Sequence, residues 1–120
     1  MSPKIPNPRR GEVWDINFDP TIGTEIKKTR PAVVLNINSI RHLKIRLVAP
    51  ITSWNNQYSN KIWVVEIKPD AANGLSHVSG VDTMQMKGVD TTRFLNKRGR
   101  LKATDMDEIN AAIVAIIDFV

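Results

Sequence analysis

The 120-residue sequence predicts a mainly β domain, in which several short strands form a small twisted sheet or barrel and one carboxyl-terminal helix packs on it. Three observations support this fold class. Apolar and polar residues alternate in short runs separated by glycine, proline, asparagine and serine, which is typical of half-buried strands. From residue 104 onward, apolar residues recur every three and four positions, which is typical of an amphipathic helix. The length suits one domain with a single core.

The first three predicted strands differ in their apolar patterns. GEVWDINF (residues 11–18) alternates and predicts a half-buried strand, whereas PAVVLNIN (31–38) begins with a continuous apolar run that predicts a central strand. In KIRLVAPIT we expect Ile45, Leu47 and Ala49 to share one face.

The second half of the sequence predicts further strands and then the helix. KIWVVEIKP (61–69) is a fourth strand stopped by proline, and residues 77–90 hold one or two more. Residues 98–102 predict a basic turn. Thr104, with Asp107 three residues later, fits the capping box that begins a helix.

Composition limits the domain organisation and the partners. Residues 1–9 hold three prolines and predict a flexible arm, so we expect one domain over residues 10–120. Cysteine is absent, which excludes disulfides, thiolate metal sites and a cysteine nucleophile. A net charge of +5 and a pI near 9.8 favour acidic partners such as nucleic acid. The sequence shows no secretory signal and no membrane span, so we expect a cytoplasmic protein without a membrane partner.

Arg30 is the first candidate site residue. Because Pro31 biases Arg30 towards an extended backbone, we expect the arginine at a junction of loop and strand, with its side chain at the rim. A guanidinium group offers a planar fork of donors that matches phosphate oxygens. An ordinary ion pair at the strand edge, for example with Glu25, explains the residue equally well.

Thr52 and Ser53 end the third predicted strand, and a polar loop follows them. Their hydroxyl groups can donate to a phosphate oxygen, although hydroxyl groups at such positions more commonly cap turns. The loop sets Trp54 and Tyr58 among amide side chains such as Asn55, a mixture that suits stacked, unpaired bases. The alternative is a solvated loop with Trp54 folded back onto the barrel.

The two histidines, His42 and His77, are candidates for acid–base chemistry because two histidines can cleave RNA as base and acid. Nothing in the sequence pairs them, and neither has a partner at metal-ligand spacing. We therefore predict both as surface residues in or near turns, and we predict no metal site and no cofactor.

One long segment resembles a known family. RGEVWDINFDPTIGTEIKKTRPAVVL, which begins at Arg10, strongly resembles the opening of MazF/PemK-type toxins of bacterial type II toxin–antitoxin systems. The family pattern there is RGEIW, a DP-x-x-G-x-E loop, and TRP before an apolar run. APITS (49–53), VDTMQMKGVD (81–90) and the terminal IIDF continue the resemblance in order, so it covers nearly the whole chain.

The resemblance implies a fold and an activity. We expect a small SH3-like β-barrel with a carboxyl-terminal helix, a homodimer, and a cognate antitoxin whose acidic, flexible tail suits a basic toxin. The expected activity is that of a metal-independent endoribonuclease, which cuts single-stranded RNA, usually mRNA, at short preferred sequences. The products would be a 2′,3′-cyclic phosphate and a 5′-hydroxyl end.

The resemblance also implies roles for individual residues. The catalytic arginine and threonine of the family fall on Arg30 and Thr52. The loop glutamate, our candidate base, falls on Glu25. Many members carry an acidic residue just before the glutamine that falls on Gln85. This chain has Met84 at the position of that acid, so Asp82 is an alternative base. The residues expected to bind RNA are Thr24, Lys27, Lys28, Ser53, Trp54, Asn55 and Gln85.

Two alternative functions stay open. Gyrase-poisoning toxins of the CcdB type share the barrel and the dimer, but they act through a tryptophan-bearing carboxyl-terminal tail, and no tryptophan follows Trp63 here. A non-catalytic RNA-binding barrel would retain the same fold and differ by binding RNA without cleaving it.

Overall fold

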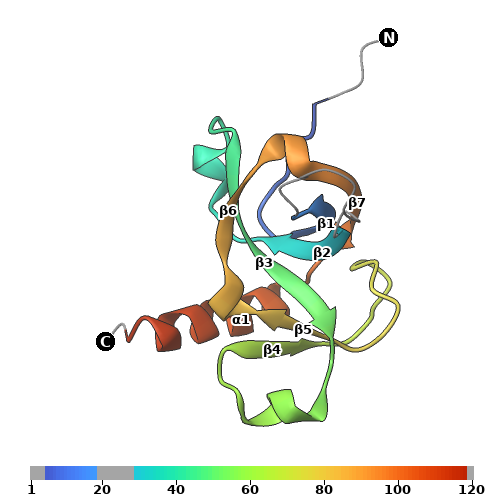
Figure 1. Cartoon of the computed structure of the whole chain (residues 1–120), viewed down its shortest axis with the longest axis vertical. Coiled ribbons are helices and arrows are strands. Elements are labelled where there is room, and N and C mark those ends of the chain that lie inside the picture. The colour runs from blue at the N-terminus through green and yellow to red at the C-terminus, as the bar shows by residue number, and fades with distance from the viewer. Residues whose placement is uncertain (1–4, 19–28, 119–120) are drawn as a thin grey trace, which may run out of the picture.

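The structure, a computed structural model, describes residues 5–18 and 29–118. In this part of the chain, seven strands are followed by one α-helix (Figure 1). The strands are β1 (Glu12–Asn17), β2 (Thr29–Val34), β3 (Ile45–Ser53), β4 (Val64–Ile67), β5 (Ser79–Asp82), β6 (Lys87–Asp90) and β7 (Phe94–Arg100). The helix α1 spans Ala103–Ile116, and the short 3₁₀-helices are η1 (Asn38–Ile40), η2 (Asn56–Asn60), η3 (Thr83–Gln85) and η4 (Thr91–Arg93).

The strands form one antiparallel sheet in the order β4-β5-β3-β2-β1-β7, with β6 paired to β3 off this path. The long strand β3 pairs with β6 through residues 45–48 and with β5 through residues 51–53. In the described part of the chain, β4 and β7 at the two ends of the path do not pair, so the sheet is curved but not a closed barrel. The predicted mainly β fold with a carboxyl-terminal helix is confirmed.

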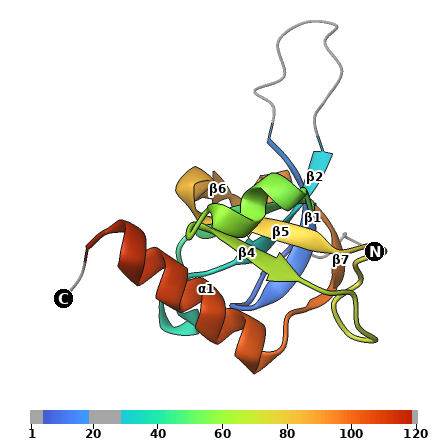
Figure 2. The same ribbon diagram turned by 90° about the horizontal axis from the view of Figure 1, so that it is seen from below.

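The curved sheet has a hydrophobic core on each of its faces. Along β2, Val33 lies in the core cluster that α1 covers, whereas Ala32 and Val34 lie in a cluster with Phe94 on the other face. Figure 2 shows α1 lying beside β4. Because β2 is buried on both faces, its apolar run is continuous, as expected of a central strand.

Strand β7 corrects the sequence prediction of a basic turn over residues 98–102. Two of its basic residues pair with acids on β1: Lys97 Nζ lies 2.9 Å from Glu12 Oε2, and Arg98 Nε lies 2.6 Å from Asp15 Oδ1. These ion pairs join residues more than 80 positions apart. The basic run is therefore strand up to Arg100, held beside the acidic positions of β1.

The start of α1 also differs from the prediction. The N-cap residue is Lys102, which makes no side-chain capping bond, and Thr104 already lies inside the helix, so the predicted capping box is wrong. None of the described helices is long and apolar enough to cross a membrane.

The side chain buried at the start of β3 is a charged one. Arg46 is only 1% exposed, whereas its neighbours Ile45 and Leu47 are 56% and 40% exposed. Arg46 Nε donates to the carbonyl oxygen of Pro8 at 2.8 Å, and its Nη2 donates to Asn7 Oδ1 at 2.8 Å. These two residues of the predicted flexible arm are therefore held against the sheet.

Candidate active site

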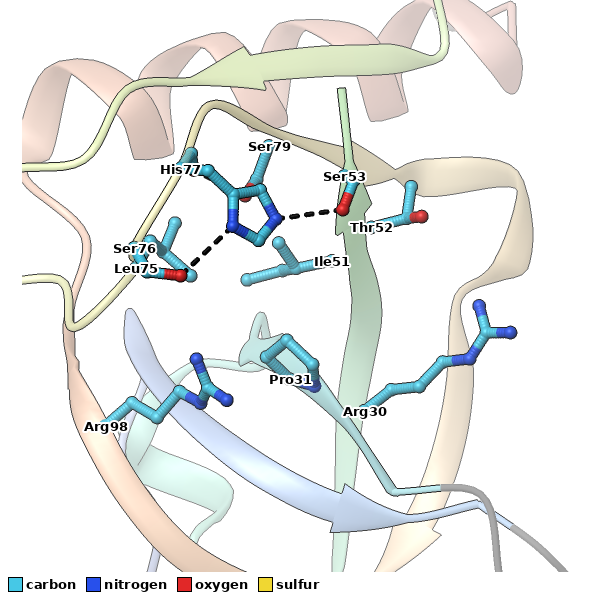
Figure 3. A pocket seen from close by; sticks show the side chains of 10 residues that line it. All are labelled: Arg30, Pro31, Ile51, Thr52, Ser53, Leu75, Ser76, His77, Ser79 and Arg98. Carbon is cyan, nitrogen blue, oxygen red and sulfur yellow. Dashed lines mark hydrogen bonds between the residues drawn. The ribbon is translucent and has the colours of Figure 1, made fainter. Parts of the chain in front are cut away.

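Arg30 lies near the start of β2, and Thr52 lies near the end of β3. The two antiparallel strands pair from Ala32 opposite Pro50 to Val34 opposite Val48. Arg30 and Thr52 therefore both lie just beyond the same end of the paired region. Figure 3 shows the guanidinium group of Arg30 and the hydroxyl group of Thr52 on the same side of the β3 tip.

A hollow of about 340 Å³ opens beside Arg30, and we call it the Phe18 hollow. Gln85 is oriented there by Asp82, since Gln85 Nε2 donates to Asp82 Oδ2 at 2.9 Å. The Nζ atom of Lys87 lies 5.2 Å from the ring centroid of Phe18, a cation–π distance. The hollow is lined by Phe18, Arg30, Pro50, Gln85 and Lys87. It thus combines two cations, an amide and an aromatic ring.

A second hollow of about 320 Å³, which we call the His77 hollow, lies across the β3 tip. Successive side chains of a strand point to opposite faces, so Ser53 and Ile51 point away from the side that Thr52 takes. In Figure 3, Ser53 and His77 lie on the other side of the tip from the Thr52 hydroxyl. The hollow is lined by Arg30, Pro31, Ile51, Thr52, Ser53, Leu75, Ser76, His77, Ser79 and Arg98. Arg30 and Thr52 therefore both border the His77 hollow, and Arg30 also borders the Phe18 hollow.

His77 is held by two serine side chains. Its Nε2 atom lies 2.8 Å from Ser53 Oγ, and its Nδ1 atom lies 3.0 Å from Ser76 Oγ. A neutral imidazole has one N–H group, so one ring nitrogen donates to a serine and the other accepts from one. The prediction of a surface residue is confirmed, and its place in this hollow was not predicted. No sequence signal links His77 to Ser53, 24 residues away.

The loop that carries His77 is fixed against β7. Buried Asn73 donates through Nδ2 to the carbonyl oxygen of Lys68 at 2.9 Å, and the amide of Arg100 donates to the carbonyl oxygen of Ala72 at 2.9 Å. Gly99 allows this approach, because a Cβ atom there would lie 2.1 Å from the Ala72 oxygen. Packing against β7 and these hydrogen bonds therefore hold the loop in place.

The loop after β3 matches the alternative in which Trp54 folds back. Trp54 is half-buried and meets the Tyr58 ring edge-to-face, with centroids 5.6 Å apart. It also covers Gly80, where a Cβ atom would lie 3.4 Å from the indole. Asn55 caps η2 by accepting from the amide of Gln57 at 3.0 Å. Contact of Trp54 or Asn55 with RNA stays a prediction, as neither lines the Phe18 or the His77 hollow.

The remaining candidates are placed as follows. Thr24, Glu25, Lys27 and Lys28 lie outside the described residues, and so does the suggested pair of Arg30 with Glu25. His42 is exposed before β3, as predicted. In the described ranges, no three histidine, aspartate or glutamate side chains gather where a metal ion could bind.

Known proteins resemble this chain in sequence and in fold. Endoribonuclease MazF9 of Mycobacterium tuberculosis is 28% identical, over 92% of this chain and 96% of its own length. A solved mycobacterial endoribonuclease in complex with its cognate antitoxin has a TM-score of 0.76 at 16% identity and covers 94% of this chain and 97% of its own. MazF of Deinococcus radiodurans has a TM-score of 0.72 at 22% identity, over 93% of this chain and 97% of its own.

The sequence also matches a protein family over residues 9–117, almost the full length of the chain. The match includes the segments that carry Arg30, Thr52 and Gln85. This chain belongs to the family of PemK-like, MazF-like toxins of type II toxin–antitoxin systems.

Proposed function

We propose that this toxin is an endoribonuclease that cuts single-stranded RNA, usually mRNA, without a metal ion. The observation that carries the proposal is that Arg30 and Thr52 lie just beyond the same end of the paired region of β2 and β3 and line one open hollow. The relative named Endoribonuclease MazF9 supports the same activity.

The reaction is an attack by the ribose 2′-oxygen on the adjacent phosphorus. A bond from the 2′-oxygen to phosphorus forms, the bond from phosphorus to the 5′-oxygen breaks, and a 2′,3′-cyclic phosphate and a 5′-hydroxyl end result. The 2′-hydroxyl loses its proton to a base, and the leaving 5′-oxygen gains one from an acid. No water and no redox partner enter this step.

Arg30 neutralises the charge that builds on the phosphorane, where a preorganised cation contributes most to the rate. Thr52, on the same face, donates to a non-bridging phosphate oxygen. Lys87 and Gln85 line the adjoining hollow and hold the next part of the strand. These contacts align the 2′-oxygen, the phosphorus and the leaving oxygen.

We propose Glu25 as the base. The alternative, Asp82, already accepts hydrogen bonds from Gln85 Nε2 at 2.9 Å and from the amide of Met84 at 3.1 Å. These bonds favour a positioning role for Asp82, through Gln85. Met84, which replaces the acid of many family members, is 62% exposed.

The partners we propose are an antitoxin and a second copy of the chain. The toxin–antitoxin family and the net charge of +5 favour a cognate antitoxin with an acidic segment. Apolar side chains exposed on η1 and on the start of β3 can be buried against a second copy, including Ile40, Ile45 and Leu47. An enzyme acting on mRNA works in the cytoplasm, which is the compartment we propose.

The test is cleavage of a long single-stranded RNA in EDTA, with the new ends mapped. We expect cyclic phosphate ends at a recurrent short sequence from the wild type, and a loss of at least about a hundredfold with Arg30→Ala. Arg100→Ala is the matched control. Arg100 lies opposite Glu12 of β1, whereas Arg30 lies opposite Ile16 of β1. These two positions of β1 are four residues apart, which is roughly 13 Å along the strand. RNA that is bound but stays intact would favour the non-catalytic alternative.

A further inference from the structure

We propose that the His77 hollow binds one nucleotide of the RNA strand, next to the phosphate that Arg30 and Thr52 hold. Arg98 donates to the phosphate group of that nucleotide, and its ribose or base packs against the His77 ring and covers the apolar floor. The inference rests on the proposed endoribonuclease function and adds a substrate subsite to it.

The chemistry of the hollow fits a nucleotide. Its floor is apolar, with Ile51 and Leu75 only 3% and 8% exposed, and its rim carries arginine, histidine and serine side chains. None of the described residues that line it is acidic, so no carboxylate faces a phosphate in the hollow itself. A volume of about 320 Å³ is at the small end for ligand pockets, which suits one nucleotide better than several.

Arg98 is placed to act on an anion. Its Nε atom is paired with Asp15 at 2.6 Å, and its Nη1 atom has a long contact of 3.5 Å with the carbonyl oxygen of Gly74. The pair with Asp15 fixes the plane of the guanidinium group. Within the described part of the chain Nη2 makes no hydrogen bond, so it can donate to a ligand in the hollow.

The tip of β3 connects the hollow to the catalytic pair. Thr52 and Ser53 are consecutive, with Cα atoms about 3.8 Å apart, and their side chains point to opposite sides. An RNA chain whose scissile phosphate lies at Thr52 must continue past this tip in both directions. The Phe18 hollow receives the nucleotides on one side of the phosphate, and the His77 hollow receives the nucleotide on the other side. Arg30 lines both.

The hollow is also preorganised. His77 is clamped between Ser53 and Ser76, and its loop is fixed by buried Asn73 and by the close approach to β7 at Gly99. A ligand therefore finds the donors in place and does not have to order the loop, which saves conformational entropy on binding.

The experiment uses short RNA oligonucleotides that contain the mapped cleavage sequence and a 2′-deoxy sugar at the scissile nucleotide. They cannot be cleaved by 2′-oxygen attack, so fluorescence anisotropy measures binding alone. One series is shortened from the 5′ end and another from the 3′ end, a nucleotide at a time. Wild type, His77→Asn and Ser53→Ala are compared, with His42→Asn as the matched histidine control.

We expect His77→Asn to weaken binding of the longest RNA by about tenfold. Removing the nucleotide that occupies the hollow should cost the wild type a similar factor and cost the variant almost nothing. In cleavage of the all-ribose RNA, KM should rise while kcat stays within about twofold. Ser53→Ala should show the same pattern more weakly, and His42→Asn should match the wild type.

Two results would overturn the subsite. One is binding by His77→Asn that equals the wild type at every length. The other is a loss of the same factor at every length, which would show a general structural effect. If the wild type binds and cleaves no RNA, the proposed function itself fails, and the inference fails with it. Cleavage by the wild type with no length-dependent effect of His77→Asn would remove the subsite alone.

Discussion

Replacing the buried Arg46 by methionine should lower the free energy of unfolding by about 2–4 kcal/mol. The guanidinium group is 1% exposed and donates five hydrogen bonds. Burial, and to a smaller degree the charge of Arg41, lowers the pKa of Arg46. Its acceptors are the carbonyl oxygens of Pro8, Arg41, Leu43 and Ile45 and the side-chain oxygen of Asn7.

The magnitude follows from two opposing effects. A hydrogen bond to a charged group contributes about 1.5–3 kcal/mol, and five such bonds would add up to most of the stability of a small domain. Bonds to one side chain are not additive, however, and losing the cation also removes the cost of its burial. Methionine fills much of the same volume, so the cavity effect is small. The unpaired carbonyl oxygens then dominate.

The assay is urea unfolding followed by tryptophan fluorescence, with the midpoint and the m-value fitted together. We expect a lower midpoint at an unchanged m-value for Arg46→Met, and an intermediate midpoint for Arg46→Lys, which keeps the charge without the planar fork. Arg100→Met, at an exposed arginine, serves as the control. A loss below about 1 kcal/mol for Arg46→Met would refute the reasoning, because it would mean that water satisfies these carbonyl oxygens.

Three further predictions concern the helix start, the His77 loop and the basic segment after Gly23. Burial raises the pKa of Asp105 above its usual 3.8, so ionisation of this carboxyl lowers the free energy of unfolding as pH rises through the folded-state pKa. Asp105→Asn should therefore raise the urea midpoint at pH 7, and this gain should disappear near pH 4, where the carboxyl is largely protonated. Gly99→Ala places a Cβ atom 2.1 Å from the Ala72 oxygen, so we expect a stability loss of about 1–3 kcal/mol and the same length-dependent RNA defect as His77→Asn. Lys27→Ala combined with Lys28→Ala should flatten the salt dependence of RNA affinity, and an unchanged slope would remove both lysines from the binding surface.

Local sequence patterns correctly predicted the elements whose burial follows from the spacing of nearby apolar residues. The continuous apolar run after Pro31 correctly predicted a central strand, because β2 packs a core on each face. The change of period after residue 104 correctly predicted α1, since one stripe of the helix, including Met106 and Ile109, enters the core. Both signals lie within a few residues, where periodicity is informative.

The errors lie where distant residues decide the structure. The basic run of β7 has the composition of a turn, and it is a strand because Glu12 and Asp15 of β1 neutralise Lys97 and Arg98. Arginine is usually a surface residue, and Arg46 is buried because backbone carbonyl oxygens from several segments surround its guanidinium group. The acids of β1 lie outside any local window, and so do the acceptors of Arg46 in Pro8 and Asn7, which are 38 and 39 residues away.

The candidate site divides in the same way. Local sequence placed Arg30 and Thr52 each at a strand end, and the family resemblance predicted them as a pair. They come near each other because both lie just beyond the same end of the β2–β3 pair and line one hollow. His77 reaches Ser53 only because the loop after β4 closes on β7, an approach that depends on the absence of a side chain at Gly99.

Side chains alternate between the two faces of β3, so Thr52 and Ser53 act on different parts of the substrate. A strand cannot direct consecutive side chains to the same side, so Ser53 cannot assist Thr52 at the reacting phosphate. Its hydrogen bond to His77 places it with the nucleotide on the far flank. Substituting Thr52 should therefore lower kcat, whereas substituting Ser53 should raise KM, and this division distinguishes two faces of one strand tip from a single cluster of hydroxyl groups.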